Sequence, residues 1–183
     1  FSSLGFRLAA GGYSQQANRS LLLEDGHIDR SWQISSGLDF VFDERFELSV
    51  DAWGKTFDQY RVLDPSGANL LSDGWAAGAE LYFRFRMVDQ LYGWIALSSA
   101  NVRLNDDVFI TDQPFTSNIV LSWELGQDWT LGFRHRYSIG APIYEPVSSV
   151  FDANNGEYLP QWSEAPNGRL PNTLFVDRGA CHW

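Results

Sequence analysis

The sequence predicts an all-β fold: part of an antiparallel transmembrane β-barrel, with about seven to eight strands of a larger barrel in this chain. Alternation of apolar and polar residues over segments of about ten residues is the first observation, and aromatic residues at segment ends are the second. The third is that short and long connections alternate. A membrane barrel sorts its connections in this way because short turns lie on the periplasmic side and long loops outside. The short connections are 43–45, 87–90 and 126–128, and the long polar ones are about 17–31, 57–74, 102–117 and 140–172.

Composition excludes several other classes of protein. The 183-residue chain has a net charge of −10, which argues against DNA or RNA as a partner because nucleic-acid binding needs a basic face. No run of apolar residues is long enough for a membrane-spanning helix. The 8 Trp, 7 Tyr and 13 Phe suit the aromatic girdles of a membrane barrel, and a single cysteine excludes an internal disulfide framework.

The first four predicted strands differ in how clearly they alternate. Residues 31–42 and 75–86 alternate most cleanly, with Trp32, Ile34, Leu38, Phe40 and Phe42 on one face of the first and mostly polar or small residues opposite. Residues 46–56 follow the same pattern, whereas about 4–14 is weaker because glycines replace polar residues. In each of the two strands that alternate most cleanly, aromatic residues stand ten residues apart: Trp32 with Phe42, and Trp75 with Phe85. The length of a tilted strand between them matches the height of an apolar band of about 25 Å.

The last four predicted strands complete the pattern. Residues 118–124 and 129–138 alternate, and Trp129 and Tyr137 stand at the two ends of the second of these. Residues 91–103 have no clear polar face, so their orientation stays open. A further strand begins at Thr173, but Ala180-Cys181-His182 breaks the alternation, and we expect 179–183 to be a truncation or a shifted frame rather than a terminal strand.

Charged residues on the polar faces are the candidate functional residues. In a large barrel this face borders a hydrated lumen or a plug, where paired charges are tolerated. These side chains either line a solute path or contact the plug, or they pair with one another across strands. The sequence leaves both alternatives open. The lumen-facing candidates are Asp51, Lys55, Glu80, Glu124, Arg134 and Arg136.

Nothing in the sequence points to catalysis. His135 falls on an apolar face, His27 lies in a predicted loop, and no serine or aspartate partner is suggested by the spacing of either. The segment 152–157 is predicted to be a polar turn, because it lacks the helical flanks and distal glutamate of a calcium loop. We therefore expect no enzyme activity, no metal site and no cofactor.

Several segments, in chain order, resemble the C-terminal half of the barrel of TonB-dependent outer-membrane receptors. Each motif is short, and their agreement in order over about 46–178 is what carries the resemblance. Phe115 stands where the family has histidine in an Asp-x-Pro-His motif. The segments are 46–58, 74–81, 93–99, 112–115, 137–144 and 167–171.

The resemblance implies that residues 1–183 are part of one barrel domain in the outer membrane of a Gram-negative bacterium, with the plug domain absent from this chain. It also implies import of a scarce solute such as a siderophore, cobalamin or an oligosaccharide. The implied partners are outer-membrane lipid, the TonB complex acting through the plug, and a transported solute that the sequence does not identify. Two other interpretations stay open: a small self-contained barrel with a structural or adhesive role, and a soluble β-sandwich binding module.

Overall fold

A computed structural model describes residues 2–16, 28–63, 69–87, 90–105, 107–109, 111–126 and 128–182. These residues form strands, turns and irregular segments, with no helix among them. A helix long and apolar enough to cross a membrane is accordingly not found in the described part of the chain. The predicted loop containing His27, and also Asp106 and Trp183, lie outside the described residues.

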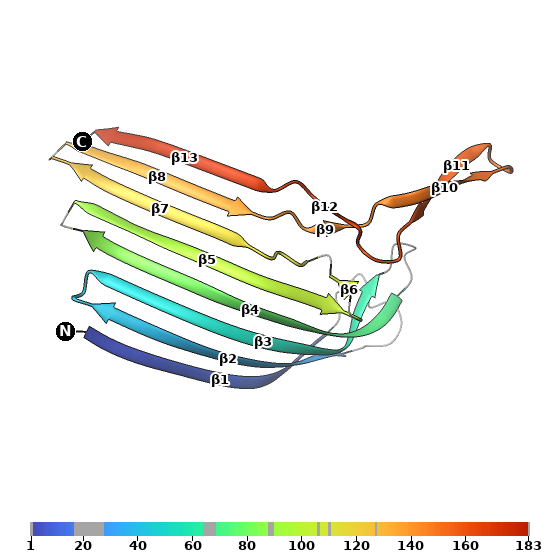
Figure 1. Cartoon of the computed structure of the whole chain (residues 1–183), viewed down its shortest axis with the longest axis horizontal. Coiled ribbons are helices and arrows are strands. Elements are labelled where there is room, and N and C mark those ends of the chain that lie inside the picture. The colour runs from blue at the N-terminus through green and yellow to red at the C-terminus, as the bar shows by residue number, and fades with distance from the viewer. Residues whose placement is uncertain are drawn as a thin grey trace.

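One antiparallel sheet accounts for most of the structure. Its strands pair in chain order, apart from the two-residue strand β6 (Asp107–Val108), which pairs with β5 beside the main path. The first and last strands have no partner on their outer sides among the described strands, so the sheet is open (Figure 1). Its eight main strands are β1 (Ser2–Gln16), β2 (Ile28–Phe42), β3 (Phe46–Leu63), β4 (Asn69–Met87), β5 (Leu91–Leu104), β7 (Thr116–Leu125), β8 (Trp129–Ser138) and β13 (Thr173–His182).

The connections are sorted by end, as the sequence predicts. The ends of β2 and β3, of β4 and β5, and of β7 and β8 that are joined by three residues each lie at one end of the sheet, here called the short-turn end, and the strand ends joined by longer segments lie at the opposite end (Figure 1). The β2–β3 turn needs left-handed backbone at Asp43 and Glu44, whose φ values are 49° and 53°. Left-handed backbone at successive residues matches the right-handed twist of the strands in a tight hairpin. Gly126, with φ of 70°, plays the corresponding part between β7 and β8.

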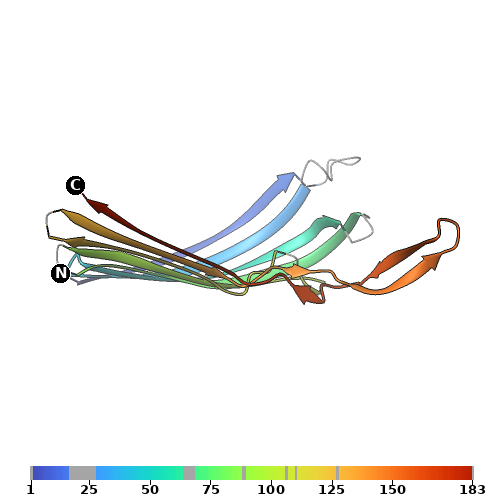
Figure 2. The same cartoon turned by 90° about the horizontal axis from the view of Figure 1, so that it is seen from above.

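Several strands are longer than the sequence predicts. β3 continues to Leu63 and β4 begins at Asn69, so most of the predicted loop 57–74 is strand. The predicted loop 140–172 contains two small ladders, β9 (Pro142–Ile143) with β12 (Gly168–Arg169) and β10 (Pro146–Asp152) with β11 (Glu157–Trp162). The β10–β11 hairpin projects away from the sheet (Figures 1 and 2). β13 continues through Cys181 to His182 in register with β8, although the apolar/polar alternation of the sequence breaks at 180–182.

The strand register divides the side chains into an apolar face and a polar face. Directly paired residues share a face, so one row of the apolar face carries Phe40, Leu48, Phe83, Ile95 and Ile119. The adjacent row lies on the polar face and includes Ala96 of β5, so the even-numbered residues of β5 lie on that face. That row is Asp39, Ser49, Tyr82, Ala96, Asn118 and Arg136.

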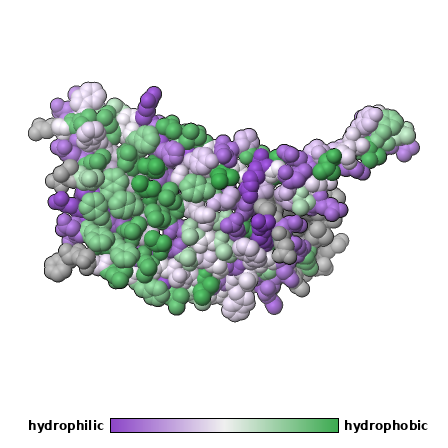
Figure 3. All heavy atoms as spheres, in the orientation of Figure 1, coloured by the Kyte–Doolittle hydropathy of each residue, from purple (hydrophilic) through white to green (hydrophobic). Residues whose placement is uncertain are grey.

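The sheet is a single layer without a covered core. Ala76 and Leu104 are the buried hydrophobic residues of the described chain, whereas Phe6 is 68 % exposed and Trp32 is 66 % exposed. Figure 3 shows hydrophobic residues gathered over the half of the sheet nearest the short-turn end, and hydrophilic residues nearer the long connections. Figure 2 shows one curved layer with no second sheet packed on it. The described residues therefore lack the second layer on which a soluble β-sandwich depends.

Candidate functional site on the polar face

The register places all six predicted lumen-facing residues on the polar face, but it does not gather them into one cluster. Asp51 and Glu80 are direct cross-strand partners on β3 and β4. Arg134 and Arg136 lie on β8, opposite Val120 and Asn118 of β7. The two remaining residues are far apart along the strands: Glu124 lies near the short-turn end, opposite Thr130, and Lys55 lies toward the long connections, opposite Ala76.

Asp51 belongs to a charge cluster that the sequence analysis did not find. The Arg7 guanidinium on β1 reaches across β2, placing its Nη2 atom 2.9 Å from Asp51 Oδ2 and 3.2 Å from Asp39 Oδ1. Gly37 lies between Arg7 and Asp51 in register, and a Cβ there would displace the Asp51 carboxylate and press on the Arg7 guanidinium. The lack of a side chain at Gly37 thus leaves room for this contact. Because Arg7 is 54 % exposed, the pair orients these groups more than it stabilises the sheet.

Mutual pairing explains only part of the charge on this face. Arg84 Nη2 lies 2.6 Å from Glu47 Oε2, so these two cross-strand partners neutralise each other. Among the six predicted residues, Asp51 is the one that makes an ion pair with another described residue. Arg134 and Arg136 make no such pair within the described residues, although the carboxylate-bearing Asp177 on β13 is the cross-strand partner of Arg134.

A small cavity lies on the polar face toward the long connections and includes Lys55. Its volume is about 150 Å³. The Lys55 ammonium lies 5.0 Å from the centre of the Phe57 ring, and Phe57 contacts Tyr60 with ring centres 5.5 Å apart. The lining thus combines aromatic surface with hydrogen-bonding groups, the usual make-up of a solute-binding site. The lining residues are Tyr13, Gln15, Asp29, Arg30, Ser31, Gln33, Lys55, Phe57 and Tyr60.

A buried ion pair fixes the base of the 140–172 segment. Asp112, with a side chain only 4 % exposed, accepts hydrogen bonds from Arg169 Nη2 at 2.7 Å and from the Val102 backbone N–H at 2.9 Å. Arg169 also donates to the Gly140 carbonyl at 3.2 Å. Gly140 lies so close to the Leu170 carbonyl that no Cβ would fit. These contacts, here called the loop clamp, hold β9 and β12 against the segment that precedes β7.

The loop clamp joins two segments in which the sequence resembles the receptor family, 112–115 and 167–171. Neither Asp112 nor Arg169 was predicted to have a role. They are 57 residues apart, and no local pattern reveals such a contact. Their joint presence in those two segments is the one signal that could have found them.

One histidine makes a contact that the spacing in the sequence did not suggest. The sequence suggested no serine partner for His135, but Ser117 Oγ lies 3.5 Å from His135 Nε2. This distance is at the limit of a hydrogen bond. No described carboxylate contacts the ring to form a charge-relay arrangement, and the described residues hold no group of three potential metal ligands. Ser117 and His135 lie on the apolar face, on adjacent strands.

Comparisons with known proteins agree with this geometry at the level of fold. No protein-family model and no curated protein matches the sequence. Among solved structures, the chain is similar to the FrpB iron transporter from Neisseria meningitidis (F3-3 variant), with a TM-score of 0.61 and 13% sequence identity. The match covers 97% of this chain and 30% of the transporter, so this chain spans less than a third of the length of the protein it resembles.

The predicted fold class is therefore confirmed. The chain is an all-β, antiparallel sheet of eight main strands, and its fold is similar to part of the FrpB structure. The sheet by itself does not close into a barrel.

Proposed function

We propose that this chain is part of the barrel of a TonB-dependent receptor in the outer membrane of a Gram-negative bacterium. In this proposal the intact protein imports a scarce solute, a siderophore, cobalamin or an oligosaccharide, with energy supplied by the TonB complex through a plug domain outside this chain. The motif resemblance over 46–178 and the fold shared with an iron transporter support it.

The observation that carries the proposal is the division of one uncovered sheet into two faces. Large apolar side chains such as Leu4, Phe6 and Leu174 are at least 65 % exposed on the apolar face. Water tolerates small apolar patches but not a continuous band of this kind on a monomer. Lipid is the solvent that suits the band, because every backbone group inside the sheet is already paired with a neighbouring strand. The polar face then borders the lumen.

Within this proposal, the Lys55 cavity and the arginines Arg134 and Arg136 act on the lumen side. The cavity lies at the end of the sheet with the long connections, which is the outer side of a membrane barrel. A solute entering from outside meets it before it meets the arginines nearer the short-turn end. We therefore assign Lys55, Tyr13 and Tyr60 to solute contact, and the two arginines to the solute path or to the plug.

The test is uptake by cells that carry or lack the gene. Labelled ferric siderophores, cobalamin and maltodextrins are supplied in turn, with and without a proton-motive-force uncoupler. We expect the deletion strain to lose uptake of one of these solutes, and the uncoupler to abolish the same uptake in the parent. Lys55→Ala combined with Tyr60→Ala should reduce uptake about tenfold without lowering the amount of barrel, because contacts to the solute are lost. Uptake that is equal in both strains, or that survives the uncoupler, contradicts the proposal.

The projecting β10–β11 hairpin favours a second candidate, a small self-contained barrel with a structural or adhesive role. Its aromatic side chains are strongly exposed, with Tyr158 at 71 % and Phe151 at 53 %. The two candidates differ in size. An antibody against 140–172 should detect a species several times longer than this chain if the receptor proposal holds, and a species near 20.7 kDa if the small barrel is correct.

A further inference from the structure

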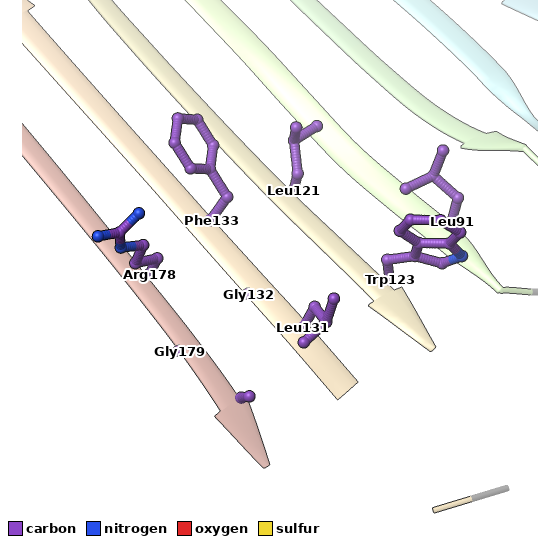
Figure 4. A pocket seen from close by; sticks show the side chains of 9 residues that line it. Leu91, Leu121, Trp123, Leu131, Gly132, Phe133, Arg178 and Gly179 are labelled. Atoms are coloured by element: carbon purple, nitrogen blue, oxygen red, sulfur yellow. The ribbon is translucent and has the colours of Figure 1, made fainter. Parts of the chain in front are cut away.

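A hollow interrupts the apolar face near the short-turn end. It has a volume of about 520 Å³, within the size range of small-molecule sites. Figure 4 shows the side chains of Leu121, Phe133 and Trp123 standing along it, together with Leu131 and Leu91. β13 leaves space in the hollow because it contributes the small side chain of Ala180 directly opposite Leu131, whereas the neighbouring strands contribute large side chains.

Arg178 lies at the rim of this hollow and does not fit an apolar surface. It is opposite Phe133 on the apolar face, and the residues before and after it on that face of β13 are Val176 and Ala180. Arg178 makes no ion pair with any described residue, whereas Arg7, Arg84 and Arg169 all do. Trp129 and His182 form the last cross-strand pair on the apolar face at the short-turn end of β8 and β13. The pair of Arg178 with Phe133 lies two pairs farther from that end on the same face.

We propose that this hollow binds one membrane phospholipid, with the phosphate on Arg178 and an acyl chain along Leu121, Leu131 and Phe133. The inference rests on the proposed function, because it needs the apolar face to contact lipid. A guanidinium binds a phosphate through two parallel hydrogen bonds, and it is less strongly hydrated than an ammonium, which suits a site at the edge of a membrane. The long arginine side chain extends toward the interface while its methylene groups stay against apolar neighbours.

The composition of the hollow favours a phospholipid over other occupants. A soluble anion would gain nothing from an apolar wall, and an uncharged lipid would leave the guanidinium without a partner. Trp123, one row nearer the short-turn end, provides the amphipathic ring that sits at headgroup level in membranes. The short-turn end faces the periplasm in a membrane barrel, so the proposed ligand comes from the inner leaflet.

The test uses the full-length protein that contains this segment, extracted in a mild detergent and examined by native mass spectrometry. The probes are phosphatidylglycerol and a diacylglycerol with the same acyl chains. We expect one phosphatidylglycerol to stay bound and the diacylglycerol to be lost. Arg178→Gln should weaken phosphatidylglycerol binding about tenfold, as the loss of charge-assisted hydrogen bonds implies. Ala180→Phe, which fills the hollow and keeps the arginine, should weaken it as well.

Arg134→Gln is the matched control, since it removes an arginine from the polar face of the adjacent strand and should leave lipid binding unchanged. Equal binding by wild type and Arg178→Gln overturns the inference, because it means that a strand outside this chain neutralises the arginine. Equal retention of diacylglycerol, or retention of lipopolysaccharide in place of phospholipid, overturns it too. Failure of the inference leaves a protein that is folded in the membrane and imports its solute. Failure of the proposed function instead appears in the uptake experiment, where the deletion strain and its parent take up every solute equally, whether or not the lipid is bound.

Discussion

Leu81→Arg is expected to prevent the protein from accumulating as a folded barrel in the membrane. Leu81 lies midway along the apolar part of β4, between Val50 and Leu97 on the neighbouring strands. An arginine at the lipid-facing midplane of a membrane barrel costs about 2–4 kcal/mol, a large share of the stability of most folded proteins. The measurement is the fraction of protein in the membrane that migrates faster before boiling than after it.

Glu80→Arg is the control for that substitution. It introduces the same side chain one residue earlier, on the polar face, where Glu80 is opposite Asp51. Replacing one of two facing carboxylates with a cation removes a repulsion, so this variant should accumulate like the wild type. If both variants accumulate equally, or if Glu80→Arg is the more harmful, the apolar face of β4 does not contact lipid.

Asp112→Asn is expected to open the loop clamp while leaving the sheet intact. The asparagine amide cannot balance the Arg169 guanidinium, and the Asp112 site is nearly closed to water. Breaking a partly buried pair of this kind costs about 2–3 kcal/mol, near the lower end of the range for buried pairs because Arg169 is 37 % exposed. The readout is hydrogen exchange at the Leu170 amide, which donates to Ala141 O at 2.9 Å. Its exchange should become at least about thirtyfold faster.

Arg84→Gln is the comparison for the clamp. It breaks an ion pair with an equally short distance, Arg84 to Glu47, but on an exposed part of the polar face where Arg84 is 50 % exposed. Exposed pairs contribute about 0–1 kcal/mol, so exchange at Leu170 should not change. Unchanged exchange in Asp112→Asn would show that the segment 140–172 is held by contacts other than the clamp.

The strands were predictable where one face of the sheet is apolar and the other is polar. β2, β4 and β8 cross the apolar band, and the alternation that it imposes is visible in the sequence from Trp32 to Phe42. The outer parts of β3 and β4 were not predictable in this way. Beyond Phe57 the chain reads Asp58-Gln59-Tyr60-Arg61, which has no apolar face, so apolar/polar alternation gives no strand signal there.

The hairpin inside 140–172 was missed for a different reason. β10 and β11 are short, and Pro160 in β11 argues against a strand. A turn signal was nevertheless present, since Asn155-Gly156 is a favoured hairpin pair and Gly156 adopts a φ of 71°. The polar segment 152–157 was predicted to be a turn, and the structure adds the strands on either side of it.

Contacts between distant residues account for what the sequence could not predict about the site. Periodicity assigned all six candidate residues to the polar side of their strands, but the registers that decide which of them meet depend on the lengths of whole hairpins. Arg7 reaches Asp51 only because β1 and β2 pair so that Gly37 lies between them. Neither contact, Arg7 with Asp51 nor Arg169 with Asp112, leaves a local trace in the sequence.

The most direct test of the central claim is the solvent at successive positions of β4. Spin labels are attached at single cysteines from 79 to 84 in the full-length protein in lipid vesicles, after Cys181 has been replaced by serine. Collision rates with oxygen, which concentrates in lipid, and with a water-soluble nickel complex are then compared. The account predicts a period of two, with Ala79, Leu81 and Phe83 favouring oxygen and 80, 82 and 84 favouring nickel. Collision rates without this alternation, or nickel access at the odd-numbered positions, would contradict it.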